Sequence, residues 1–229
     1  MRQRYNSDKS LILHLNLTNM AIDIKADKAE FIGLLKSTGR EGMDYVISDL
    51  EDLGFFDAPA SAGHHLNTVG GLVRHSLNTY RAAMAIFDSM KTLEPSLSGD
   101  VKPESIIIAT LLHDVCKADI YKRTVKKRRD QLGNWVDSEG YKVSYRNFPM
   151  GHGEKSVIWL LCAGLALNDD EMLAIRWHMG AWGINMNSLE ETRSYDTARK
   201  LYPLVSIVHS ADTLAASLLE RTAEELDEI

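Results

Sequence analysis

The sequence predicts an all-helical domain that carries one small inserted β-ribbon. Apolar residues recur at intervals of three and four over most of the chain, which is the spacing of a helix face. Only five prolines occur in 229 residues, so long helices can form. Between residues 121 and 146 the helical spacing gives way to strand-forming residues. Hydrophobic residues make up 45% of the chain, which is enough for a substantial core.

The first part of the chain predicts an extension followed by two helices. Residues 1–20 are polar apart from one short apolar run, and the sequence does not decide whether this extension is ordered. We expect a single helical domain over residues 21–229. Apolar spacing predicts one helix at about 28–35 and another at 43–53. Gly39 and Gly42 separate these helices, and Gly54 ends the second.

The middle of the chain predicts the centre of the domain. Gly70 and Gly71 precede a long helix over about 71–91, and Asp100 and Pro103 mark the start of another. The run from Ile106 to Leu112 is apolar nearly all round. Because such a helix must be covered on most sides, we place it at the centre.

The ribbon is predicted over about 121–146. Its strand formers are separated by two turn-like sequences, Leu132-Gly-Asn and Ser138-Glu-Gly. A basic run on its first half could guide a polyanion, or could be exposed charge that prevents strands from pairing at an edge. The run comprises Lys122, Arg123, Lys126, Lys127, Arg128 and Arg129.

Helical spacing returns after the ribbon. It predicts one helix from residue 153 to 167 and a second through residues 172–177, with Asn168 or Asp169 as the N-cap. A last helix is predicted over about 195–219, with a bend near Pro203. We expect the acidic residues 220–229 to fray.

Charge, cysteine content and hydropathy restrict the class of protein. A net charge of −6 argues against a surface wholly committed to nucleic acid. Cys116 and Cys162 form no CxxC pair and each lies in an apolar run, which predicts two buried free thiols in a reducing compartment. No window reaches the roughly 18 apolar residues of a membrane helix, and we read no secretory signal. We therefore expect a cytoplasmic protein without a membrane partner.

The dipeptide His113-Asp114 points to a metal site. It ends the apolar run, so two ionisable side chains lie at the end of a buried helix, which would cost several kcal/mol if they had no partner. A divalent metal suits imidazole and carboxylate ligands and supplies the compensating charge. Neighbouring helix residues point about 100° apart, so other helices must provide further ligands. Asp212 and His75 lie on similar apolar helices and are the candidates.

The order His75, His113-Asp114, Asp212 resembles the HD-domain metal-dependent phosphohydrolase superfamily. The supporting motifs are Gly70-Gly-Leu-Val-Arg-His-Ser-Leu and Leu111-Leu-His-Asp-Val-Cys-Lys. The resemblance covers roughly residues 55–220 and implies an HD-domain helical bundle in which these four residues bind one metal. The β-ribbon is a departure from the family pattern.

Two further histidines, His152 and His178, match the dinuclear branch of this superfamily in order and spacing. This resemblance implies that they hold a second ion and that Asp114 bridges the two. The region is similar to HD-type diadenosine tetraphosphate hydrolases and, around residues 70–77, to HD-type 3′–5′ exoribonucleases. The mixed nitrogen and oxygen ligands suit Fe, Mn, Zn, Ni or Co, as one or two ions.

Basic side chains near these ligands are candidate substrate contacts. Lys117 lies one helical turn after Asp114, and we predict that it binds phosphate and acts with Asp114 in catalysis. Lys155 stands in the same relation to His152. His64 and His65 precede the helix of His75 and are candidates for touching substrate or for a surface role. A further histidine, His209, is either a hydrogen-bonded core residue or a residue that orients Asp212.

The sequence therefore predicts a hydrolase that cleaves a phosphate ester or anhydride of a small nucleotide-like substrate with metal-bound hydroxide. A divalent ion lowers the pKa of bound water from ~16 towards ~7, which makes hydroxide available at neutral pH. Two alternatives stay open. One is a 3′–5′ nuclease that acts on single-stranded nucleic acid ends, and the other is a non-catalytic nucleotide-binding module. The substrate, the choice of metal and the oligomeric state do not follow from the sequence.

Overall fold

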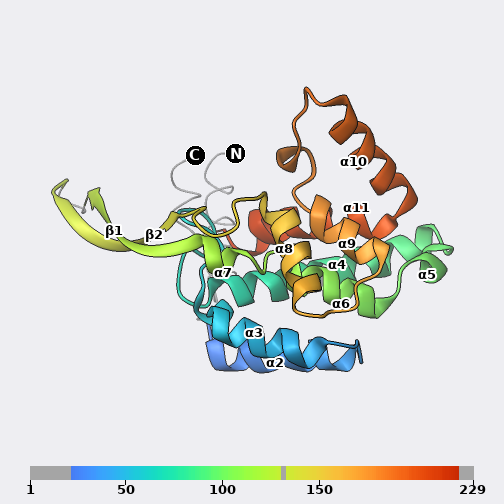
Figure 1. The fold of residues 1–229 in the computed structure, drawn as a ribbon, viewed down its shortest axis with the longest axis horizontal. Helices are drawn as coiled ribbons and strands as arrows, with labels where there is room; N and C mark the ends of the chain where they lie inside the picture. Colours follow the sequence, from blue (N-terminus) through green and yellow to red (C-terminus); the bar gives the residue numbers. More distant parts are fainter. Residues whose placement is uncertain (1–21, 130–132, 222–229) are drawn as a thin grey trace, which may run out of the picture.

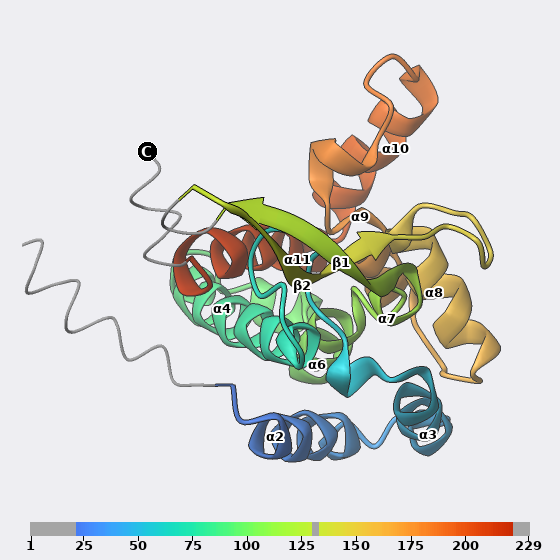
Figure 2. The ribbon, with the colours of Figure 1, turned by 90° about the vertical axis from the view of Figure 1, so that its left-hand side faces the viewer.

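The computed structural model describes residues 22–129 and 133–221. The expected N-terminal extension and residues 222–229 lie outside the described part. Within it the chain is mainly helical, with a two-stranded antiparallel ribbon, so the predicted fold class is confirmed (Figures 1 and 2). None of the helices that the structure describes has the length and apolar character needed to cross a membrane.

Two N-terminal helices form a layer beneath the rest of the bundle (Figure 1). Helix α2 (Ile24–Ser37) begins at Asp23, whose side chain accepts a hydrogen bond from the backbone of Ala26. Helix α3 (Met43–Leu53) is followed by a short 3₁₀ turn, η1 (Phe55–Asp57). Gly42 precedes α3 with φ of 86°, and a Cβ there would lie 2.1 Å from the carbonyl oxygen of Gly164. This glycine therefore lets the layer approach the rest of the domain closely.

The centre of the domain is built from α4 (Gly71–Leu93) and α6 (Pro103–Leu112), with the short α5 (Leu97–Asp100) between them. Helix α6 packs against α2, α4, α9 and α11. Its prediction as a central helix is confirmed, because seven of its ten residues are buried, namely Ser105, Ile106, Ile108, Ala109, Thr110, Leu111 and Leu112.

Helices α8 (His152–Cys162) and α9 (Asp169–Trp177) pack against each other. Asn168 caps α9 in a reciprocal capping box with Glu171, as the sequence predicted. Helix α8 ends earlier than predicted, because Gly164 adopts φ of +85° just beyond it. Of the two thiols, Cys116 is buried as predicted, whereas the prediction for Cys162 is wrong, since its side of α8 faces solvent.

The last predicted helix is two helices. Helix α10 (Leu189–Leu201) stands away from the bundle (Figure 2), and α11 (Pro203–Leu214) packs on α4 and α9. Tyr202 between them has extended backbone, because Pro203 disfavours the helical conformation in the preceding residue. A π-helical turn, η3 (Ala215–Leu219), follows α11. The next residue, Glu220, is only 3% exposed, so the prediction that it frays is wrong.

The ribbon projects from the helices next to the short α7 (Lys117–Ile120) (Figure 1). Strand β1 (Tyr121–Arg129) pairs with β2 (Trp135–Val143) in a register that runs from Tyr121 opposite Val143 to Arg129 opposite Trp135. The ribbon is confirmed and ends at residue 143 rather than 146. Residues 138–140 continue β2 instead of turning, and the absence of a side chain at Gly140 leaves room for that of Lys126.

Candidate metal centre

Five helical segments bring six metal-ligating side chains to one place in the core. Helix α4 carries one of them, the end of α6 two, the first turn of α8 one, the end of α9 one and α11 one. Four of the six are buried to 1% exposure or less. The six are His75, His113, Asp114, His152, His178 and Asp212.

Two of the histidines are oriented by the helices that they end. Nδ1 of His113 donates to the carbonyl oxygen of Thr110 at 2.7 Å, and Nδ1 of His178 donates to that of Ile175 at 2.7 Å. The last carbonyls of a helix have no partner within it, so these bonds form readily. Because Nδ1 carries the hydrogen, Nε2 of each ring is left with a free lone pair. Both Nε2 atoms lie near the carboxylate of Asp114.

One group of ligands lies around Oδ2 of Asp114. That oxygen is 3.2 Å from Nε2 of His113 and 3.7 Å from Nε2 of His75. Oδ1 of Asp212 is 3.1 Å from Nε2 of His75 and 3.8 Å from Nε2 of His113. Two imidazole nitrogens and two carboxylates thus surround one position.

A second group lies around the other oxygen of the same carboxylate. Oδ1 of Asp114 is 3.4 Å from Nε2 of His178 and 3.8 Å from Nε2 of His152. The two rings are 5.0 Å apart between centroids. Because its oxygens face separate groups, the carboxylate of Asp114 lies between the two groups.

Apart from Lys117, whose ammonium pairs with Oδ2 of Asp114, the facing atoms have no other partner within hydrogen-bond geometry. Within the part of the chain that the structure describes, both oxygens of Asp114 are buried without a hydrogen bond. The same holds for Nε2 of all four histidines, His75, His113, His152 and His178. A buried polar atom without a partner costs about 1–3 kcal/mol, and six of them together would oppose folding strongly. A divalent cation accepts lone pairs from nitrogen and oxygen alike, so these residues could hold one.

The electrostatics of the cluster also suit a cation. Burial raises the pKa of Asp114, but the charges of Lys117 and His113 outweigh this effect and hold the pKa well below its usual range. Burial lowers the pKa of His75, yet Glu220 and Asp212 outweigh it and raise the pKa to about 10. The carboxylates are therefore ionised at neutral pH, and a proton on His75 provides positive charge that a metal ion could replace.

The second group differs in charge. Burial lowers the pKa of His152 to about 4, so this imidazole is neutral at pH 7. The pKa of His178 is raised instead, because Asp114 outweighs the effect of burial. Neutral imidazole is the form that binds a metal, and His152 is already in that form.

A model of the HD domain family matches residues 72–217, which is more than half of the chain. This chain belongs to the HD domain family. The match extends from α4 to η3 and includes all six residues of the cluster. HD domains bind divalent metals, and the family is generally one of metal-dependent hydrolases. No curated protein and no solved structure matches the chain.

The HD domain brings one of the two predicted lysines to the cluster. Nζ of Lys117 lies 2.5 Å from Oδ2 of Asp114 and is largely buried. Burial lowers its pKa, but Asp114 outweighs this and raises the pKa above its usual value, so the ammonium stays charged. Lys155 instead donates to Asp119 and to the carbonyl oxygen of Asn147, each at 2.6 Å. No contact joins Lys155 to the six clustered residues within the described chain.

The three other histidines of the described chain are His64, His65 and His209. The ring of His65 is 5.1 Å from that of His75 between centroids. The side chain of His64 lines a separate groove along α4. Nδ1 of His209 donates to the carbonyl oxygen of His178 at 2.7 Å, so His209 holds the backbone of a clustered residue rather than the carboxylate of Asp212.

Glu220 contacts the cluster but was not predicted from the sequence as a residue of this site. Both carboxylate oxygens of Glu220 lie close to Nδ1 of His75, at 3.0 and 2.9 Å. Glu220 follows Asp212 by eight residues, which is close to two helical turns and places both near one side of a helix axis. That spacing was the available signal, but the acidic composition of residues 220–229 suggested a frayed tail.

Proposed function

We propose that this HD domain hydrolyses a phosphate ester or anhydride of a small nucleotide-like substrate with the help of bound divalent metal. The observation that carries the proposal is the set of buried nitrogen and oxygen atoms at Asp114 and its four neighbouring histidines that have no hydrogen bond in the described chain. Two ligand groups share that carboxylate. His75, His113, Asp114 and Asp212 would hold one ion, and Asp114, His152 and His178 a second.

The ions, when bound, lower the pKa of a coordinated water and neutralise charge on the phosphate. Asp114 would fix the spacing of the two ion positions, because its oxygens face one group each. Lys117 places a permanent positive charge beside it. An ammonium has three hydrogens, so Lys117 could hold Asp114 and a phosphate oxygen at once and stabilise negative charge that develops in the transition state.

A small pocket beside the ribbon is where we propose that the nucleotide part of the substrate binds. It has a volume of about 390 Å³, within the range of small-molecule sites. Its walls are residues 67–69, which lead into the helix of His75, and the ribbon, which follows the helix of Lys117. Arg123 could bind a phosphate, while Asn67 and Glu139 offer donors and acceptors for the edge of a base.

The test is hydrolysis of p-nitrophenyl phosphate and of a panel of nucleotides with added Mn²⁺. We expect metal-dependent phosphate release by the wild type and none by Asp114→Ala, with both ion positions lost. Asp196→Asn, which changes a residue of α10 that pairs with Arg199 and Lys200, is the matched control and should retain wild-type activity. Equal activity of Asp114→Ala and wild type would refute the proposal. Tight nucleotide binding with bound metal and no turnover would instead identify a nucleotide-binding module.

The charge of the ribbon favours a second candidate, a 3′–5′ nuclease acting on single-stranded ends. Among its described strand residues seven are basic and exposed, whereas two are acidic, although the chain as a whole carries −6. Binding of an oligonucleotide should then weaken steeply with salt. The double variant Lys127→Ser, Arg128→Ser should flatten that dependence. Salt-insensitive turnover of mononucleotides without oligonucleotide cleavage would exclude the nuclease.

A further inference from the structure

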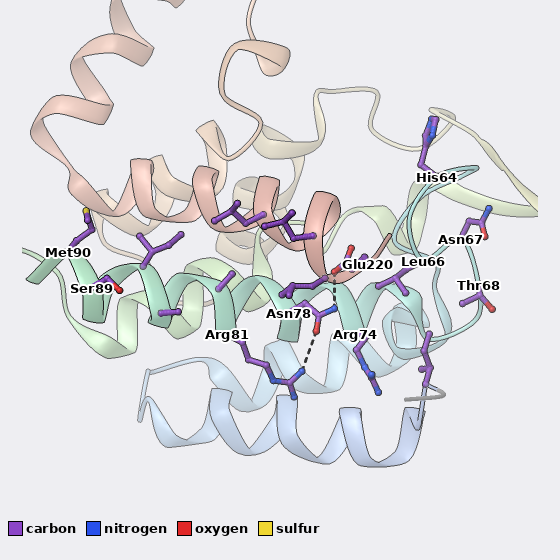
Figure 3. A pocket seen from close by; sticks show the side chains of 17 residues that line it. His64, Leu66, Asn67, Thr68, Arg74, Asn78, Arg81, Ser89, Met90 and Glu220 are labelled. Carbon is purple, nitrogen blue, oxygen red and sulfur yellow. Dashed lines mark hydrogen bonds between the residues drawn. The ribbon is translucent and has the colours of Figure 1, made fainter. Parts of the chain in front are cut away.

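Glu220 is a buried carboxylate whose contacts all lead to the region behind His75. Its two oxygens lie 3.0 and 2.9 Å from Nδ1 of His75. Nδ2 of Asn78 donates to Oε1 at 3.0 Å (Figure 3), and Nε2 of His65 lies 3.9 Å from Oε2. Within the described chain no lysine or arginine pairs with it. A buried charge held only by such partners is costly, so a merely space-filling role would favour an apolar residue here.

The hydrogen bond between Nδ1 of His75 and Glu220 determines which ring nitrogen of His75 is available to bind a metal. Because Nδ1 donates its hydrogen to Glu220, Nε2 is the nitrogen that offers a lone pair once the ring has lost its second proton. Nε2 then faces Asp212 at 3.1 Å and Asp114 at 3.7 Å. The bond therefore fixes both the tautomer and the direction of the ring.

His75 differs in this respect from the other two fully buried histidines. His113 and His178 donate Nδ1 to neutral backbone carbonyls of their own helices. Helix α4 continues well past His75, so its carbonyls there are already engaged within the helix. A side chain from elsewhere must take that place, and a carboxylate raises the basicity of the ligand nitrogen as well as orienting it.

A line of hydrogen bonds supports Glu220 from the surface. Nη1 of Arg81 lies 3.3 Å from Oδ1 of Asn78, and Nη2 of Arg81 pairs with Glu30 at 2.7 Å. Arg81, Asn78 and Glu220 all line a groove of about 1080 Å³ between α4 and η3 (Figure 3). Asn78 thus holds the carboxylate from the groove side while His75 holds it from the core.

We propose that Glu220 is a positioning residue of the metal centre, which keeps His75 in the tautomer and orientation that bind a divalent cation through Nε2, with Asn78 holding Glu220 in place. The inference rests on the proposed metal centre but not on the identity of the substrate. It predicts that Glu220 controls affinity for the ion that His75 binds, whereas a purely structural role would change stability alone.

The experiment measures metal binding directly in the full chain after removal of metal by chelation. Mn²⁺ is titrated by calorimetry, and Co²⁺ is followed by its visible absorption. Glu220→Ala should weaken one of the two Mn²⁺ sites about 10- to 100-fold. Glu220→Gln should have a smaller effect, because its amide oxygen still accepts from Nδ1. The Co²⁺ spectrum should change in both variants.

The matched control is Glu171→Gln, which changes an equally buried glutamate whose partners are Arg40 and Ser105. This variant should lower the melting temperature while leaving Mn²⁺ affinity at the wild-type value. Wild-type Mn²⁺ affinity and an unchanged Co²⁺ spectrum in folded Glu220→Ala would overturn the inference. If that variant does not fold, Glu220→Gln and Asn78→Ala decide, and unchanged Mn²⁺ affinity in both would overturn it.

The outcome separates this inference from the proposed function. A wild-type chain that binds Mn²⁺ but releases no phosphate would refute the hydrolase, while weaker binding in Glu220→Ala would still support the positioning role. Conversely, an active hydrolase whose Mn²⁺ affinity is unchanged in Glu220→Ala would refute only the positioning role.

Discussion

At the scale of single residues, two buried carboxylates differ in whether their oxygens are already taken. Glu171 accepts hydrogen bonds from both terminal nitrogens of Arg40 at 2.7 Å, from Ser105 and from the backbone of Asn168. Asp114 pairs through Oδ2 with the ammonium of Lys117, and in the described structure neither of its oxygens has a hydrogen bond. The oxygens of Glu171 are therefore already used in structural hydrogen bonds, whereas those of Asp114 could still bind a cation.

This difference predicts the effect of removing the guanidinium from Glu171. Arg40→Met should lower the free energy of unfolding by roughly 3–5 kcal/mol, because it leaves a buried charge without a partner. The measurement is urea denaturation in excess chelator. Lys28→Met, which removes an exposed pair with Glu51, is the control and should cost about 0–1 kcal/mol. A loss as small as that control for Arg40→Met would contradict the argument. Mn²⁺ affinity should not change in either variant.

The sequence predicted six residues that the structure brings together, because ionisable groups in apolar helices are conspicuous in composition alone. Their role as ligands remains a prediction. Glu220 could not be predicted in the same way, since it stands at an acidic stretch and its burial depends on how η3 returns to α4. Lys155 shows the converse, because its spacing from His152 resembles that of Lys117 from Asp114, yet Asp119 lies within its reach and takes its ammonium.

At the scale of elements, the second ligand group depends on how closely α8 approaches α9. Gly153 follows His152 on the first turn of α8. A Cβ at this position would lie 2.4 Å from the carbonyl oxygen of Arg176, which is backbone and cannot move aside cheaply. The absence of a side chain at Gly153 therefore allows His152 and His178 to face the same oxygen.

Gly153→Ala should push α8 away from α9 and weaken the ion position of His152 and His178. The ion position of His75, His113 and Asp212 should be retained, since those residues lie on other helices. Metal analysis should then give close to one Mn²⁺ per chain in place of two. Gly33→Ala on α2 is the control, because a Cβ there meets no atom within 4 Å and metal content should not change. Two tightly bound ions in Gly153→Ala would show that the close approach is not required.

Element boundaries were predicted where local chemistry determines them. Asn168 and Glu171 form a capping box that depends on four consecutive residues, and α6 is buried because its sequence is apolar on all sides. The bend predicted near Pro203 is a complete break at Tyr202, and the continuation of β2 through Ser138 was missed. The first depends on a proline effect that competes with a continuous apolar pattern, and the second on pairing with β1, which is not a local property.

At the scale of the whole molecule, the six clustered side chains come from α4, α6, α8, α9 and α11 or from the residues that end these helices. A cation bound there would link all five segments in the folded state only. Adding Mn²⁺ at about 100 times its dissociation constant should therefore stabilise the wild type by about 2.7 kcal/mol for each site that it fills. Thermal or urea denaturation with Mn²⁺ and with chelator measures this difference. Asp114→Ala should show none, and equal stability of the wild type in both conditions would contradict a shared ion site.

The distance along the chain between His75 and Glu220 determines how long after the synthesis of His75 its contact with Glu220 can form. They are 145 positions apart, and a ribosome adding about 5–20 residues per second needs roughly 7–30 s to make that stretch. During this time the nascent polypeptide offers only scattered donors that any passing ion binds poorly. We therefore expect the proposed ion position of His75 and His113 to be completed only after α11 and η3 have been made, and a chain that ends before Asp212 to lack it.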